Sequence, residues 1–138
     1  MGLFRLFLRK GQNMTIQEAI DTVDEMKPNM MSARLKYKYL TEIEQLIHDE
    51  IVMKHEHEAA LEQKPDYTED TDPLTVLIVP DPYSMLYVYW LMCKIDLLNM
   101  EADKYNNDRA LFDNAYDTMS DWWTRKKMPV RRTGEFLI

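Results

Sequence analysis

The chain has 138 residues, of which 46% are hydrophobic and 30% are charged, and its formal net charge is −7. This is the size of one domain, and the composition is that of a soluble globular protein, which excludes a disordered tail or a membrane span. The negative charge repels nucleic acid phosphates, so the protein is not expected to wrap DNA. The single cysteine excludes an internal disulfide and a cysteine-rich zinc site.

The two ends of the chain differ from its middle in charge. Residues 1–10 contain three basic side chains and no acidic one, and residues 125–132 contain five basic side chains. The apolar stretch at the N-terminus is interrupted by an arginine and is followed by no small-residue cleavage site, so it is not expected to be a signal peptide. We therefore divide the chain into an N-terminal arm (1–13), a folded helical domain (14–129) and a C-terminal tail (130–138).

Two amphipathic helices are predicted in the first half of the domain. Thr15 and Glu18 form the pattern of a capping box, in which two side chains bind backbone amides that the first helical turn leaves unpaired. Apolar residues then recur at helical spacing until Pro28, which cannot continue the hydrogen-bond ladder. The second helix is predicted to begin after a cap at Ser32 and to end beyond Met53, because its apolar residues repeat with a period near 3.6.

A long connection is predicted from about His55 to Pro82. It contains four prolines and an acidic, polar stretch, which interrupt any helical pattern. Only residues 74–79 are apolar and β-branched, and they favour an extended segment. A connection of this length inside a small domain usually has a function or is mobile.

A third helix is predicted to begin with Pro82 in its first turn and to run through Cys93. It is apolar on nearly all sides, so it must be covered by its own bundle or by another subunit. The run is too short to cross a bilayer. Leu91 and Leu97 are both expected to be buried.

The fourth helix is predicted to follow a stop and a new cap at residues 106–108 and to end before Pro129. Trp122 and Trp123 cannot both face one core, because neighbours on a helix point about 100° apart. One of them is expected to contact a loop, the tail or another subunit. The predicted fold class is all-α: a small four-helix bundle with a long Pro-containing acidic loop between the second and third helices and with extended arms.

The sequence contains no catalytic signature. The three glycines all lie outside residues 12–133, which excludes a phosphate-binding loop, and no serine is flanked by glycines as in serine hydrolases. His48, His55 and His57 lie among carboxylates, but their spacing fits neither a zincin nor a di-iron bundle. We interpret them as the solvated end of a charged helix. We therefore predict that the protein is not an enzyme and binds no metal and no cofactor.

A pattern of apolar and turn residues resembles a known family. It comprises residues 15–20, 27–29, 71–73 and 77–83, followed by Leu86-Tyr87, Ile95-Asp96, Glu101, Tyr105-Asn106-Asn107, Leu111-Phe112, Tyr116, Trp122-Trp123-Thr124-Arg125 and Met128-Pro129. From about Met14 to Pro129 the chain resembles the head-tail adaptor (connector, head completion) proteins of long-tailed double-stranded-DNA bacteriophages.

The resemblance implies a structural virion protein. Twelve copies would form a ring beneath the portal after packaging of the viral genome. The ring would continue the DNA channel to the stopper and tail, so that double-stranded DNA passes without specific binding during genome ejection. The protein would be made in the bacterial host cytoplasm, would lie in the neck of the virion and would have no membrane partner.

Three groups of candidate site residues accompany this reading. The tail residues that the resemblance places on the portal are Arg131, Arg132, Phe136, Leu137 and Ile138. The acidic loop residues expected to face the channel and repel DNA are Asp66, Glu69, Asp70 and Asp72. The aromatic residues expected at the interface between subunits are Tyr87, Trp90, Trp122 and Trp123.

Two other functions are open at this point. One is a small acidic helical regulator or anti-repressor that binds a host protein through its acidic face. The other is a metal-dependent enzyme that uses the histidine cluster.

Overall fold

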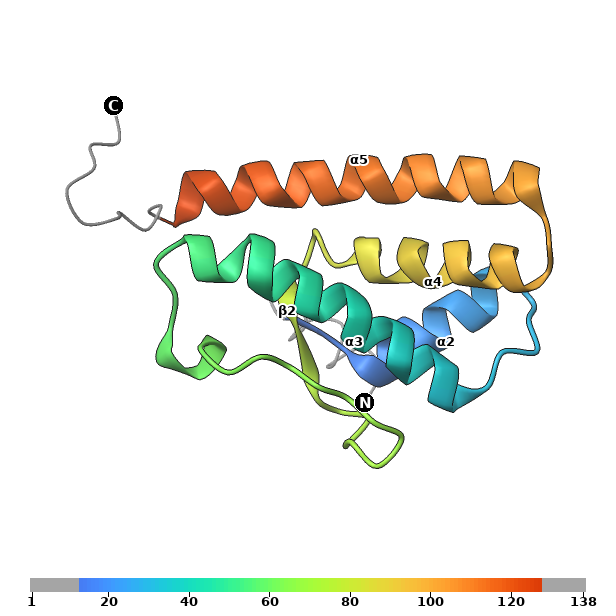
Figure 1. The fold of residues 1–138 in the computed structure, drawn as a ribbon, viewed down its shortest axis with the longest axis horizontal. Helices are drawn as coiled ribbons and strands as arrows, with labels where there is room; N and C mark the ends of the chain where they lie inside the picture. The colour runs from blue at the N-terminus through green and yellow to red at the C-terminus, as the bar shows by residue number, and fades with distance from the viewer. Residues whose placement is uncertain (1–12, 128–138) are drawn as a thin grey trace, which may run out of the picture.

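The computed structural model describes residues 13–127, and this part of the chain forms four α-helices and a two-stranded antiparallel sheet (Figure 1). In chain order the elements are β1 (Asn13–Thr15), α2 (Ile16–Met26), α3 (Ala33–Glu50), β2 (Val76–Pro80), α4 (Met85–Leu98) and α5 (Ala102–Lys126). Two short 3-10 helices, η1 (Val52–Lys54) and η2 (Ala59–Leu61), lie between α3 and β2. The fold is mostly helical, as predicted, but the small sheet was not predicted.

Side chains at the predicted caps begin the first two helices. The Thr15 hydroxyl accepts a hydrogen bond from Glu18 N (3.1 Å), and Thr15 N donates to the Glu18 carboxylate (3.0 Å). The capping box before α2 is therefore confirmed. The Ser32 hydroxyl accepts from Leu35 N (3.2 Å) at the start of α3, which confirms the second cap.

The sheet joins the end of the long connection to the start of the described chain. β1 pairs with β2 in antiparallel fashion, and Ile16 N donates to the Thr75 carbonyl (3.0 Å) just beyond the paired strands. The Asn13 side chain also donates to the Leu77 carbonyl (2.7 Å). The extended segment predicted at residues 74–79 is thus confirmed as β2, and its partner is the three residues before α2.

Helix α4 lies in the middle of the molecule, between α5 on one side and α2 and α3 on the other (Figure 1). Leu86, Leu91 and Ile95 are fully buried, so the apolar sequence of α4 reflects cover by three helices. Leu97, however, is half exposed, and its predicted burial is wrong. It lies seven residues after Trp90, on a face of α4 that is only partly covered.

The boundary between the last two helices was predicted wrongly. α4 ends at Leu98 and α5 begins at Ala102, so residues 106–108 lie inside α5. The stop is at Met100, which has a positive φ of 58°. Met100 N donates to the Leu97 carbonyl (3.2 Å) and Glu101 N to the Asp96 carbonyl (2.9 Å), the two hydrogen bonds of a Schellman motif. The stop was missed because methionine occupies the position where glycine or asparagine is expected.

The start of α4 also differs from the prediction. The Asp81–Pro82 peptide bond is cis, and the helix begins at Met85 rather than at Pro82. Before it, Ser84 donates a hydrogen bond to the Asp81 carboxylate. The predicted tail (130–138), and all of the predicted arm except Asn13, lie outside the described residues.

Candidate functional site

A fully buried carboxylate, Glu44 on α3, joins the long connection to the helices. Glu44 accepts hydrogen bonds from the Tyr87 hydroxyl, the Tyr67 hydroxyl (2.9 Å) and Ile78 N (2.9 Å). The Tyr87 hydroxyl in turn accepts from Val79 N (2.9 Å). Both carboxylate oxygens therefore have donors, and one side chain connects α3, β2, α4 and the connection.

Burial raises the pKa of Glu44 to about 7, although the hydrogen bonds from Tyr87, Ile78 and Tyr67 act to lower it. A carboxyl group that titrates near neutral pH is a common feature of active sites. Glu44 has no exposed surface, however, and its carboxylate is occupied by hydrogen bonds from Tyr67, Tyr87 and Ile78 N. We therefore interpret the Glu44 cluster as structural. Sequence analysis missed it because Glu44 lies among charged residues on an amphipathic helix.

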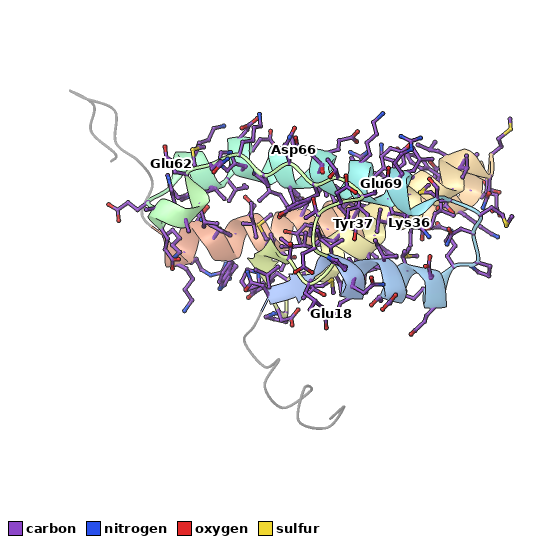
Figure 2. All side chains as sticks on the ribbon, turned by 90° about the horizontal axis from the view of Figure 1, so that it is seen from below. Glu18, Lys36, Tyr37, Glu62, Asp66 and Glu69 are labelled. Carbon is purple, nitrogen blue, oxygen red and sulfur yellow. The ribbon has the colours of Figure 1, made fainter. Side chains whose placement is uncertain are left out.

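The acidic loop is held against α3 by hydrogen bonds to backbone atoms. The Thr41 hydroxyl donates to the Tyr67 carbonyl (3.0 Å) and accepts from Tyr67 N (2.9 Å). The Gln45 side chain donates to the Pro65 carbonyl (3.0 Å). Figure 2 shows Asp66 and Glu69 spread along this segment over α3. The acidic loop therefore has a fixed position on the outside of α3.

The four predicted channel-facing carboxylates, Asp66, Glu69, Asp70 and Asp72, are all exposed. Two of them are close to basic residues. Glu69 and Asp70 line a shallow cavity of about 330 Å³ together with Arg34 and Lys38 from α3. The loop is thus acidic, but half of it lies next to compensating positive charge.

Two of the three histidines, His48 and His55, do not form the solvated end of a charged helix, so that interpretation is wrong for them. His48 and His55 are buried. His48 Nε2 lies 3.0 Å from the Leu61 carbonyl, and His55 Nδ1 lies 2.7 Å from the Ile51 carbonyl. Both rings therefore bind backbone carbonyls at the turns that follow α3. Sequence analysis missed this because the partners are Leu61 in η2 and Ile51 at the end of α3, and the sequence predicted neither η2 nor the end of α3 at this position.

The aromatic residues predicted at a subunit interface divide into two pairs. Tyr87 and Trp123 are buried within the chain and have no surface to offer a neighbour, so their assignment to an interface is wrong. Trp90 and Trp122 are partly exposed. Trp122 stacks on Tyr83, in the segment before α4, with ring centroids 5.0 Å apart. The prediction that one of the two adjacent tryptophans contacts a loop is confirmed.

An ion cluster at the end of α2 connects three helices. Lys27 Nζ binds the Asp96 carboxylate on α4 and the Asp108 carboxylate on α5, the latter at 2.8 Å. Asp96 is completely buried, and Lys27 and Asp108 are nearly so. Burial and the neighbouring Asp108 carboxylate raise the pKa of Asp96 to about 6, while the ion pair with Lys27 acts in the opposite direction.

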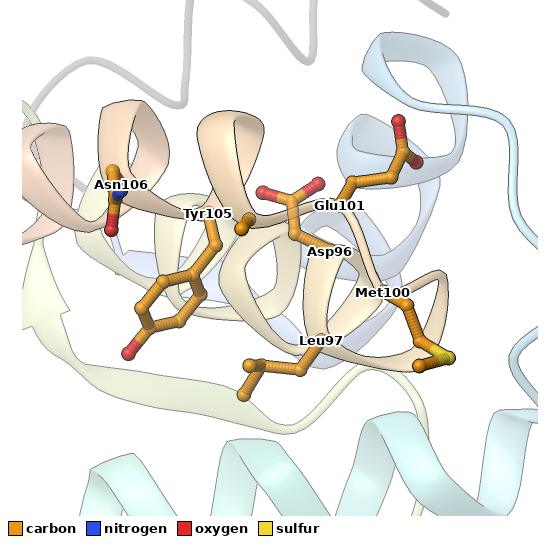
Figure 3. A pocket seen from close by; sticks show the side chains of 7 residues that line it. Asp96, Leu97, Met100, Glu101, Tyr105 and Asn106 are labelled. Atoms are coloured by element: carbon orange, nitrogen blue, oxygen red, sulfur yellow. The ribbon is translucent and has the colours of Figure 1, made fainter.

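Beside this ion cluster, a cavity of about 290 Å³ opens at the turn between α4 and α5 (Figure 3). Leu97, Met100 and Tyr105 give it an apolar wall, and Asp96 and Glu101 add carboxylates. Figure 3 shows Leu97 reaching this space from α4 and Tyr105 reaching it from α5. The carboxylates of Asp96 and Glu101 already pair with Lys27 and Lys104, so the lining suits an apolar side chain.

Other kinds of site find no support among residues 13–127. No group of three or more histidine, cysteine, aspartate or glutamate side chains in this range could hold a metal ion. Cys93 is buried, and burial raises the pKa of its thiol to about 11, so it is not an activated nucleophile. None of the helices described here combines the length and the apolarity that crossing a membrane requires.

Comparison of the chain with protein-family models, with curated proteins and with solved structures finds no match.

Proposed function

We propose that the protein is a structural head-tail adaptor of a long-tailed double-stranded-DNA bacteriophage. In this proposal the described helices are a small bundle, and twelve copies assemble into a ring beneath the portal. The ring continues the DNA channel to the stopper and tail. The C-terminal tail, including Arg131, Arg132, Phe136, Leu137 and Ile138, docks on the portal; these residues lie outside the described part of the chain.

The observation that carries the proposal is that residues of the family-like pattern contact one another across the fold. Lys27, from the first part of the pattern, binds Asp96, which is 69 residues later. Tyr83 stacks on Trp122. Each contact joins parts of the pattern that are far apart in the sequence, so these two pairs of pattern residues lie together in the fold. This coherence supports the resemblance on which the proposal rests.

The surface charge is compatible with a DNA conduit. A channel wall should repel the duplex so that DNA slides past it, and exposed carboxylates do this. Asp66 and Asp72 are the better candidates for such a wall, because Glu69 and Asp70 share their cavity with Arg34 and Lys38. Of the alternatives, the metal-dependent enzyme finds no supporting cluster in residues 13–127.

The proposal is tested by binding of the full-length protein to a purified portal protein from the same genome. We expect binding at micromolar concentration or tighter. Deletion of residues 130–138 should weaken binding about tenfold or more, because the basic and apolar tail lies beyond the last helix. Circular dichroism should show unchanged helix content in the truncated protein.

Two results would contradict the proposal. The first is the absence of any complex with portal at micromolar concentration. The second is recovery of a host transcription factor from a lysate by a protein that does not bind portal, which would favour the acidic regulator. Equal portal affinity of the full-length and truncated proteins would contradict only the role given to the tail.

A further inference from the structure

One end of the molecule exposes several large apolar side chains. Leu97, Leu98 and Met100 are 53%, 52% and 90% exposed, and together with the adjoining cavity of about 290 Å³ we call them the apolar end. Met30, which is 95% exposed, belongs to the connection between α2 and α3, and Figure 1 shows this connection at the same end as the turn between α4 and α5. Single exposed apolar residues are ordinary, but a contiguous group marks an interaction surface.

The backbone at Met100 gives a second, independent indication. Met100 occupies the left-handed position of the Schellman motif, with a φ of 58°. A residue with a Cβ atom costs about 1 kcal/mol more than glycine in this conformation. The side chain is also almost fully exposed to water. Methionine is thus unfavourable here both for the local backbone and for hydration, and a partner that covers the side chain explains why it is present.

The charges around the apolar end indicate what that partner is. Residues 24–27 and 96–108 contain six carboxylates and two lysines. Lys27, Lys36 and Lys104 pair with four of these carboxylates, and the region keeps an acidic excess. The opposite end of α5 carries Arg125, Lys126 and Lys127, and residues 125–129 contain no acidic side chain. This basic segment (125–129) also includes Met128, which is apolar. It therefore complements the apolar end in both charge and hydrophobicity.

The apolar end and the basic segment are too far apart to contact each other within one molecule. α5 has 25 residues and spans about 37 Å at 1.5 Å per residue. α5 begins at Ala102, next to the turn that follows α4, and ends at Lys126, so the two features lie at opposite ends of this helix (Figure 1). A contact between the apolar end and the basic segment is therefore between two copies of the chain.

We propose that the apolar end binds residues 125–129 of a second copy of this chain, which leaves the tail 130–138 to the portal. The contact joins two different surfaces, so each copy has one of each and can bind two neighbours, which produces a closed ring or an open filament. The proposal names the contact between copies in the proposed ring, and it rests on the proposed function for the closure of that ring. The tests of this contact contain no portal protein. A failure of the chain to self-associate can therefore be distinguished from a failure to bind portal.

The first test is the substitution Met100→Gly. Glycine adopts the left-handed conformation freely, so the monomer should unfold at a higher temperature while self-association weakens about tenfold or more. Sedimentation velocity at low salt measures association, and thermal unfolding measures stability. Leu74→Ala is the matched control, because Leu74 is 62% exposed but lies outside the apolar end; it should leave association unchanged. A more stable Met100→Gly protein that associates like the wild type would overturn the proposal.

The second test mixes two variants that are defective at opposite ends. One carries Leu97→Asp and Met100→Asp, and the other carries Arg125→Glu and Lys126→Glu. Each alone should remain monomeric, whereas an equimolar mixture should form a dimer and nothing larger, because each variant retains one intact surface. The dimer should weaken as salt is raised. Wild-type protein that stays monomeric at millimolar concentration in low salt, or an Arg125→Glu, Lys126→Glu variant that associates like the wild type, would overturn the proposal.

Discussion

Two stretches of α4 differ sharply in their surroundings although both are apolar. The first three turns are enclosed by α2, α3 and α5, and Leu86, Leu91 and Ile95 are fully buried there. In the last turn Leu97 and Leu98 are about half exposed. An apolar sequence on all sides of a helix therefore predicts that much of the helix is covered. It does not indicate which turns its own chain covers.

The ion cluster at the border between these stretches offers the largest expected effect. Lys27→Met leaves the buried Asp96 and Asp108 carboxylates without their cation, which should lower the free energy of unfolding by about 3–5 kcal/mol at pH 7. Urea denaturation measures this loss. Below pH 6 the loss should shrink, because the pKa of Asp96 is raised to about 6 and the protonated group needs no cation.

A matched control for Lys27 is Lys64→Met. Lys64 binds Asp49 on the surface, and both side chains are about half exposed, so the loss should be a small fraction of that for Lys27→Met. Similar losses of unfolding free energy for the two variants would show that the ion cluster at Lys27 does not hold α2, α4 and α5 together.

The contrast within α4 is tested directly by two alanine variants. Leu91→Ala should lower the free energy of unfolding by about 2–5 kcal/mol, because it opens a cavity in the core. Leu97→Ala should lower it by less than about 1 kcal/mol, because Leu97 is half exposed in the monomer. Chemical denaturation of dilute protein measures both, and a loss for Leu97→Ala as large as that for Leu91→Ala would refute the description of the last turn as surface.

The enclosed region should also make stability depend on pH through Glu44. Its folded-state pKa of about 7 lies above the ordinary 4.5, so between these values the folded protein binds more protons than the unfolded chain. The contribution of Glu44 is therefore fully present below pH 4.5 and falls by about 3 kcal/mol as the pH rises to 7. Glu44→Gln removes this titration. The stability of the wild type relative to Glu44→Gln should fall by that amount over this range, and a constant difference would contradict the raised pKa.

The features that sequence analysis predicted are those fixed by neighbours along the chain. The capping box at Thr15 and Glu18 and the cap at Ser32 depend on residues three positions apart, and both were correct. The extended segment that became β2 followed from β-branched composition, although its pairing with β1 did not.

The features that it missed depend on contacts between distant segments. Burial of Glu44 requires Tyr67 and Tyr87, which are 23 and 43 residues away. Burial of His48 depends on the turn at Leu61. The end of α4 was missed for a different reason, since Met100 adopts a backbone conformation that its residue type disfavours. The apolar end, the strongest candidate site, is therefore where local sequence preference and structure disagree.

Under the proposed function, other copies of the chain and the portal cover the remaining surface of this helical protein in a ring. Negative-stain electron microscopy of the full-length protein mixed with its portal tests this most directly. We expect an added ring of density on one face of the portal, with a mass corresponding to twelve copies. Portal particles that remain unchanged at micromolar concentrations of the protein would contradict the claim.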